Sequence, residues 1–138
     1  MANKRAAKPK ATDWQNRELA TWNVSTYHQM LIDKNEELYG VTYQPFGKGS
    51  VSTRYMSEKG QIKGAQGQYG NAVLKRYIEI CFAKHRFNPE YPCLSFGFMF
   101  AYMRNELAQA QAEIARESKR KEAAEKQPEA SDIDSGWF

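Results

Sequence analysis

The clearest hydrophobic pattern in the chain lies between Asn71 and Arg86. On a wheel of 3.6 residues per turn, its apolar side chains occupy one broad arc: Val73, Leu74, Tyr77, Ile78, Ile80, Cys81 and Phe82. The opposite arc carries Lys75, Arg76, Glu79 and Arg86. The pattern predicts an amphipathic helix that buries one face in a core and presents a mainly basic face outside.

A short helix is predicted near the N-terminus, over residues 12–22. Thr12 and Gln15 have the spacing of a capping box, in which two side chains satisfy the first free backbone donors of a helix. Trp14 and Trp22 would then lie on the same face of this helix.

A second helix is predicted after a polar interruption at residues 23–25. Ser25 offers an N-cap, apolar residues recur at helical spacing as far as Leu38, and Gly40 is a typical residue just past a helix end. His28 falls inside this helix. We expect it to be a surface or half-buried polar residue rather than a ligand.

Over residues 41–55 the helical spacing of apolar residues is lost. β-branched and aromatic side chains stand at both ends of this segment, around Pro45, Gly47, Gly49 and Ser50. This arrangement predicts a β-hairpin with a glycine-rich turn, and a loop is the alternative. The spacing of a P-loop is absent, but two glycines beside Lys48 would let the backbone approach a nucleic-acid phosphate closely.

Three glycines punctuate the next segment, residues 57–69: Gly60, Gly64 and Gly67. Each costs about 1 kcal/mol in a helix relative to alanine, so the segment predicts either a weak helix or an irregular loop. Gly70 closes it and Asn71 is a candidate cap of the amphipathic helix. In a helix, Lys59 and Lys63 would project from one face, and the low bulk would let another backbone lie close.

A long C-terminal helix is predicted from about Phe96 to Lys126, with Ser95 as its cap. Apolar residues form a stripe along its first half: Phe96, Phe100, Met103, Leu107, Ala110 and Ile114. We expect the stripe to pack on the domain's own core, and a homodimer seam is the alternative. Gln127–Pro128 is expected to end the helix.

Together these elements predict a mainly α fold: a small helical domain with a short β-hairpin and a long C-terminal helix. The domain spans residues 12–115, followed by a solvated helix extension over 116–127. Residues 1–11 carry four basic side chains and nothing to bury, which predicts a disordered basic arm. Residues 128–138 form an acidic tail with an aromatic tip.

Cysteine and histidine usage argues against an enzyme. Cys81 lies on the apolar arc and predicts a buried free thiol in a reducing compartment rather than a disulfide with Cys93. Cys81, His85 and Cys93 lack the paired spacing of a zinc site, and no carboxylate pair stands beside a nucleophile. We therefore expect no catalytic residues, no metal and no cofactor. No apolar run approaches a membrane span, which favours a cytoplasmic protein without a membrane partner.

The net charge of +4 is small, but its distribution is uneven. Residues 41–86 are strongly basic, with acidic side chains only at 58 and 79. We take seven residues of this stretch as candidate phosphate contacts: Lys48, Arg54, Lys59, Lys63, Lys75, Arg76 and Arg86. Tyr43, Phe46 and Tyr55 would stack on the bases of a single strand. Ordinary surface lysines over a tyrosine-rich core are the alternative.

The tail carries aspartates and two large aromatic side chains, which would expose apolar surface unless a pocket covers them. The candidate partner-binding residues are Asp132, Ile133, Asp134, Trp137 and Phe138. Alternatively, Trp137 and Phe138 fold back onto their own domain. The acidic tail would also be able to occupy the basic surface when nucleic acid is absent.

This tail resembles the acidic tips of single-stranded-DNA-binding proteins and of some phage replication and late-transcription proteins, which recruit partners or a sliding clamp. In that family the tip usually ends in Ile-Pro-Phe, whereas Gly136–Trp137 replaces the proline step here. The Tyr39–Val41, Tyr69–Asn71 and Leu94–Met99 segments are similar in style to small helical proteins of tailed bacteriophages.

The resemblance implies a DNA-binding accessory protein of phage DNA replication, in the cytoplasm of a bacterial host cell. Its tail would recruit a replication or transcription protein. The alternative is a protein-interaction adaptor that binds RNA polymerase or another host machine as a transcription regulator.

Overall fold

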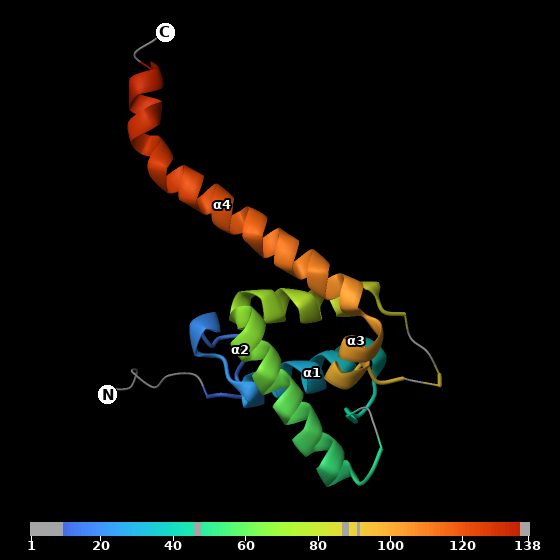
Figure 1. Cartoon of the computed structure of the whole chain (residues 1–138). Coiled ribbons are helices and arrows are strands. Elements are labelled where there is room, and N and C mark those ends of the chain that lie inside the picture. The colour runs from blue at the N-terminus through green and yellow to red at the C-terminus, as the bar shows by residue number, and fades with distance from the viewer. Residues whose placement is uncertain (1–9, 46–47, 87–88, 91, 136–138) are drawn as a thin grey trace, which may run out of the picture.

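The fold is taken from a computed structural model, which describes residues 10–45, 48–86, 89–90 and 92–135, with side chains as far as Glu125. The elements in this part of the chain are a 3-10 turn, η1 (Leu19–Thr21), and four helices (Figure 1). The helices are α1 (Val24–Tyr39), α2 (Val51–Lys84), α3 (Phe96–Tyr102) and α4 (Arg104–Ser135). The predicted mainly α fold is confirmed, and α2 contacts every other helix.

The β-hairpin expected over residues 41–55 is wrong, because the described residues contain no strand. Residues 41–45 are extended, but α2 already begins at Val51, where a second strand was expected. The side chain of Ser50 accepts a hydrogen bond from the Thr53 N–H at 3.2 Å and caps the helix. Buried Tyr43 packs the extended segment onto the helices.

The helix expected over residues 12–22 is also wrong. Turns at residues 11–12 and 14–16 come first, and η1 follows them. Side chains close these turns: Arg17 donates to the Thr21 carbonyl from Nε at 3.0 Å and from Nη2 at 2.8 Å. Trp14 and Trp22 nevertheless meet edge to face, with ring centroids 6.4 Å apart.

Helix α1 begins with a reciprocal cap, and Asn23 rather than Ser25 is the N-cap residue. Asn23 Oδ1 accepts from the Thr26 N–H at 3.1 Å, while Thr26 Oγ1 accepts from the Asn23 N–H at 3.2 Å. Gly40 ends the helix as predicted, with φ of 66°. The inward face of α1 buries Tyr27 and Leu31.

Helix α2 unites the predicted weak helix and the amphipathic helix across a kink. Gly70 forms the kink with φ of 84° and ψ of 162°, and the two halves run at a large angle to each other (Figure 1). The side chain of Asn71 holds this corner. Its Oδ1 accepts from Tyr27 Oη at 2.7 Å and from Gln66 Nε2 at 2.9 Å, and its Nδ2 donates to the Leu19 carbonyl at 2.8 Å. The kink is thereby tied to both η1 and α1.

The second half of α2 supplies much of the core, as its pattern predicts. Leu74, Tyr77, Ile78 and Cys81 are fully buried. Cys81 is a free thiol, as expected, and burial raises its pKa to about 12. It is therefore held as an unreactive thiol.

The predicted single C-terminal helix is split into α3 and α4. Ser95 caps α3 as expected, accepting from the Phe98 N–H at 3.2 Å, but Met103 has φ of −124° and ψ of 46° and interrupts the helix. The break lets α3 bury Phe96 while α4 crosses the second half of α2 (Figure 1). The apolar stripe packs on the chain's own core, with Leu107 buried within it.

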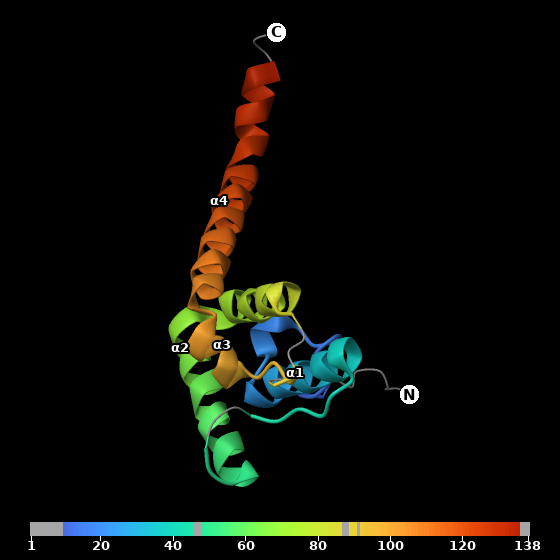
Figure 2. The same cartoon turned by 90° about the vertical axis from the view of Figure 1, so that its right-hand side faces the viewer.

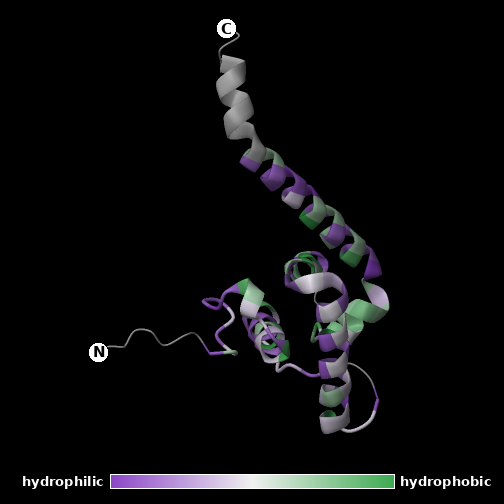
Figure 3. Cartoon of the chain, turned by 60° about the vertical axis from the view of Figure 1, so that its left-hand side comes forward, coloured by the Kyte–Doolittle hydropathy of each residue, from purple (hydrophilic) through white to green (hydrophobic). Residues whose placement is uncertain are grey.

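Beyond Ile114, α4 leaves the domain. Figures 1 and 2 show it projecting away from the other helices, and Figure 3 shows that most of its residues from 115 to 125 are hydrophilic. The expected end at Gln127–Pro128 is wrong, because α4 continues to Ser135. A proline inside a helix costs about 3 kcal/mol through a lost hydrogen bond and a clash with the preceding turn, whereas alanines on either side, such as Ala124 and Ala130, favour the helix.

Candidate nucleic-acid interface

Glu58 is the one acidic residue between Val41 and Ile78, and its side chain is 2% exposed. Tyr43 donates its hydroxyl hydrogen to Glu58 Oε1, and His28 Nε2 lies 2.9 Å from the same oxygen. The Gly97 N–H donates to Glu58 Oε2 at 3.4 Å. The carboxylate of α2 is therefore turned inward, where it joins α1, the extended segment and α3.

The sequence reasoning missed this buried cluster. His28 is buried, so its expected surface or half-buried position is wrong. The sequence did contain a signal for the burial of Glu58: it precedes Ile62 by one helical turn, which places both side chains on the inner face of α2. Burial raises the pKa of Tyr43 well above its ordinary value, and the charge and hydrogen bond of Glu58 raise it further.

The burial of Glu58 leaves only positive charge on the outer face of the first half of α2. Lys59 and Lys63 are exposed one turn apart, and Lys48 is exposed in the turn before the helix. Beside the lysines stand three glycines: Gly60, Gly64 and Gly67. A Cβ atom added at any of them would meet nothing within 4 Å, so no internal contact requires glycine there. We call Lys48, Lys59, Lys63 and these glycines the α2 face.

Three of the other candidate phosphate contacts do not belong to the α2 face. They either contact other groups of the protein or lie elsewhere on its surface. Arg54 is half-buried, and its Nη1 donates to the Pro45 carbonyl at 3.1 Å. Lys75 Nζ lies 5.4 Å from the ring centroid of Trp22. Arg86 is exposed just beyond the C-terminal end of α2.

Arg76 is turned toward α4. Its Nη1 lies 2.8 Å from Glu113 Oε1 and 2.7 Å from Glu117 Oε2, and its Nη2 donates to Glu117 Oε1 at 3.0 Å. The hydrogen bonds to Glu117 and Glu113 raise the pKa of Arg76, and those from Arg76 lower the pKa of Glu117. Arg76 therefore holds α4 against α2.

The predicted stacking residues are not displayed for a base. Tyr43 is buried, Tyr55 is half-buried with its hydroxyl donating to the Tyr43 carbonyl at 3.4 Å, and Phe46 lies outside the described residues. A different aromatic pair is near the surface. Tyr102 is 67% exposed, and its ring centroid lies 4.9 Å from that of Phe98. No role was assigned to this pair from the sequence, because neither residue belongs to the apolar stripe of Phe96, Phe100 and Met103.

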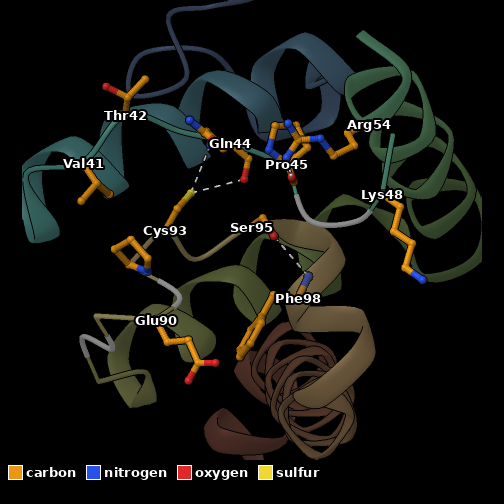
Figure 4. Close-up of a pocket in the computed structure, with 11 residues that line it drawn as sticks. Val41, Thr42, Gln44, Pro45, Lys48, Arg54, Glu90, Cys93, Ser95 and Phe98 are labelled. Carbon is orange, nitrogen blue, oxygen red and sulfur yellow. Dashed lines mark hydrogen bonds between the residues drawn. The ribbon is translucent and has the colours of Figure 1, made fainter. Parts of the chain in front are cut away.

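A pocket of about 500 Å³ opens where residues 41–45, the start of α2 and the segment before α3 come together (Figure 4). Its apolar lining includes Pro45, Pro92 and Phe98, and its charged lining residues are Lys48, Arg54 and Glu90. The free thiol of Cys93 closes one wall. Its Sγ accepts from the Gln44 N–H at 3.3 Å and donates to the Gln44 carbonyl at 3.6 Å.

Neither a metal centre nor a membrane span is found in the part of the chain that the structure describes. Its residues include no group of three or more His, Cys, Asp or Glu side chains placed to hold a metal ion. None of its helices is long and apolar enough to cross a membrane.

The two termini carry predicted binding segments. The backbone of Asp132, Ile133 and Asp134 lies in the last turns of α4, whereas Trp137 and Phe138 lie outside the described residues. Most of the predicted basic arm, residues 1–9, lies outside them as well.

In comparisons with known proteins, no family model matches the chain, and no significant match was found among curated proteins or solved structures. Its function must therefore be inferred from its own residues.

Proposed function

We propose that this protein is a non-enzymatic nucleic-acid-binding protein that binds through the α2 face. The observation that carries the proposal is the burial of Glu58, which removes the only negative charge from the stretch that holds Lys48, Lys59 and Lys63. An exposed basic stretch attracts phosphates and releases their counterions, which is the main source of affinity in such contacts.

The glycines of the α2 face support the proposal. Each costs about 1 kcal/mol of helix propensity relative to alanine, yet none packs against another part of the described fold. Their low bulk lets a sugar-phosphate backbone lie close to the helix between the lysines. We leave Arg76 out of this interface, because its guanidinium is engaged by Glu113 and Glu117.

The proposal extends to a role in phage DNA replication, in which the tail recruits a second protein. This part rests on the resemblance of residues 131–138, and α4 supports it by carrying the tail away from the domain. The start of α2 and the end of α4 lie at opposite ends of the molecule (Figures 1 and 2). Nucleic acid and a partner would therefore be bound at separate places.

A second candidate is the protein-interaction adaptor that binds RNA polymerase or another host machine. The observation that favours it is the outer part of α4, residues 118–125, whose side chains are all exposed and which projects away from the other helices. A rigid helix of this kind would suit a protein partner.

Binding to fluorescently labelled oligonucleotides, measured by anisotropy at several salt concentrations, tests the proposal. The full chain is compared with the double variant Lys59→Ala/Lys63→Ala. The control is Lys119→Ala/Lys121→Ala, which removes the same charge from the exposed part of α4. The first variant should bind more weakly, with a slope of log K against log[salt] that is smaller by about 1.4 on a single strand, or about 0.7 per lost contact.

Two results would contradict the proposal: no binding by the full chain at low salt, or equal weakening by both double variants. Capture of a protein partner that survives high salt and needs Trp137 and Phe138 would favour the adaptor.

A further inference from the structure

We infer that the pocket at the start of α2 holds one unpaired nucleotide, so that the protein binds single strands in preference to duplexes. This inference rests on the proposed function and names the form of nucleic acid that the interface selects. The pocket lies next to the α2 face and shares Lys48 with it. A strand that follows the lysines of α2 therefore reaches the pocket without leaving the basic surface.

The phosphate end of the site is set by Arg54. The carbonyl of Pro45 fixes its guanidinium through Nη1 at 3.1 Å. Arg54 lines the pocket, and a phosphate oxygen is the acceptor that an arginine fork fits best. Lys48 lines the same side of the pocket and supplies a second positive charge (Figure 4).

The base end of the site is apolar and aromatic. Phe98 lines the pocket across from Arg54, and Pro92 adds a second apolar surface (Figure 4). The ring of Phe98 is in contact with the exposed ring of Tyr102, which continues the aromatic surface out of the pocket. Bases stack on such surfaces with little dependence on sequence, because every base has a π face.

Glu90 sets the orientation of the nucleotide. Figure 4 shows Glu90 on the side of Phe98, away from Arg54 and Lys48. A phosphate near this carboxylate would be repelled, whereas base amino groups donate hydrogen bonds to carboxylates. The phosphate therefore lies toward Arg54 and the base toward Phe98.

The volume and the chemistry of the pocket together disfavour a duplex. A pocket of about 500 Å³ falls in the range of small-ligand sites and accommodates one nucleotide. In a duplex every base is paired and stacked, and it enters a pocket only after both interactions are broken. A single strand avoids most of that cost.

The test compares a single-stranded oligonucleotide with its blunt duplex, using the full chain at one low salt concentration. We expect the single strand to bind at least tenfold more tightly. Tyr102→Ala and Arg54→Gln should each weaken single-strand binding severalfold and weaken duplex binding less. Leu38→Ala is the matched control for Tyr102→Ala, because it also truncates an exposed apolar side chain, which is 51% exposed. Thermal melting of each variant checks that it is folded.

A second readout follows the base directly. An oligonucleotide that contains 2-aminopurine should change its fluorescence when the full chain stacks the base, and this change should shrink with Tyr102→Ala. Equal affinity for both forms of DNA, with Tyr102→Ala and Arg54→Gln both silent, would overturn the inference and leave the proposed function standing. Absence of binding to either form would overturn both.

Discussion

His28 Nε2 on α1 lies 2.9 Å from Glu58 Oε1 on α2, and both side chains are buried. The contact joins two helices that are separated by the extended segment 41–45. It also determines the charge of the outer face of α2, because a carboxylate that faces inward leaves the exposed lysines without a negative charge beside them. Packing and the proposed function thus depend on the same carboxylate.

Glu58→Ala should reduce the free energy of unfolding strongly. It leaves the Tyr43 hydroxyl and His28 without their buried acceptor, and a buried polar group left without its partner typically costs about 1–3 kcal/mol. Glu79→Ala, an exposed acid on the same helix, should change stability by less than about 0.5 kcal/mol. Urea unfolding followed by circular dichroism measures both, and similar midpoints for the two variants would contradict a stabilising role for Glu58.

Gly70→Ala should destabilise the fold, because φ of 84° with ψ of 162° is a strained conformation for a residue with a Cβ atom. The expected cost is about 1–3 kcal/mol. Gly64→Ala is the matched control, since its backbone is helical and its Cβ would meet open space. It should raise stability by up to about 1 kcal/mol. The melting temperatures of the two variants should therefore shift in opposite directions. Shifts of the same sign would contradict the conclusion that the kink requires glycine at position 70.

Bulk added to the α2 face should weaken nucleic-acid binding without unfolding the protein. In Gly60→Leu/Gly64→Leu, two side chains rise from positions with free space and hold a phosphate backbone away from the lysines. Ala83→Leu adds an exposed leucine to the other half of α2 and should have no effect. Anisotropy titrations of folded protein compare the two, and unchanged affinity in the double variant would show that the glycines do not admit the strand.

Arg76→Ala should loosen α4 without unfolding the domain. Arg76 clamps the exposed Glu117, while buried Leu107 and Ala110 still hold the start of the helix. Amide hydrogen exchange should become faster over residues 111–121, and it should not do so in Arg120→Ala, which removes an exposed arginine from the same helix.

The clamp should also depend on pH in a defined direction. The pKa of Glu117 is lowered in the fold by Arg76, so the contact contributes fully above the ordinary glutamate pKa and is lost as pH falls through the lowered value. Exchange rates of α4, corrected for the intrinsic effect of pH, that stay constant down to pH 3 would contradict this.

Stability should fall as pH rises above about 10. Burial raises the pKa of Tyr27, Tyr43 and Tyr77, so the folded state keeps these phenols protonated at a pH where the unfolded chain ionises them. Their contribution is fully present below the ordinary tyrosine pKa and is lost above it. Urea midpoints at pH 8 and pH 11 measure the effect, and equal midpoints would be evidence against buried phenols.

Elements whose pattern reflects burial were predictable from the sequence. The arc of Leu74, Tyr77, Ile78 and Cys81 identifies the core helix, because apolar residues that recur at helical spacing on one face are typical of a helix packed against a core. Gly40 and Ser95 were assigned as cap residues, because their local chemistry is nearly independent of the rest of the chain.

Elements that depend on distant contacts were not predictable. The extended segment 41–45 pairs with no strand in the described fold, because Tyr43 finds Glu58 and the Phe96 N–H, which donates to Tyr43 Oη at 3.2 Å. The break at Met103 likewise follows from the need to bury both α3 and the start of α4. Neither constraint is visible in the local sequence.

The candidate site was predictable only in part. Lys48, Lys59 and Lys63 follow from the basic stretch, and the structure leaves them exposed. Arg76 belongs to the same stretch, yet its partners Glu113 and Glu117 lie some forty residues away in the sequence. The inward direction of Glu58 likewise became visible only with the fold.

Backbone amide shifts in ¹⁵N-labelled full-length protein, titrated with a single-stranded oligonucleotide, would locate the nucleic-acid interface residue by residue. We expect the largest shifts on residues 48–67, with a second group at 98–102 around Phe98 and Tyr102. Shifts confined to the exposed part of α4, or none at a low salt concentration, would contradict the claim that the α2 face binds nucleic acid.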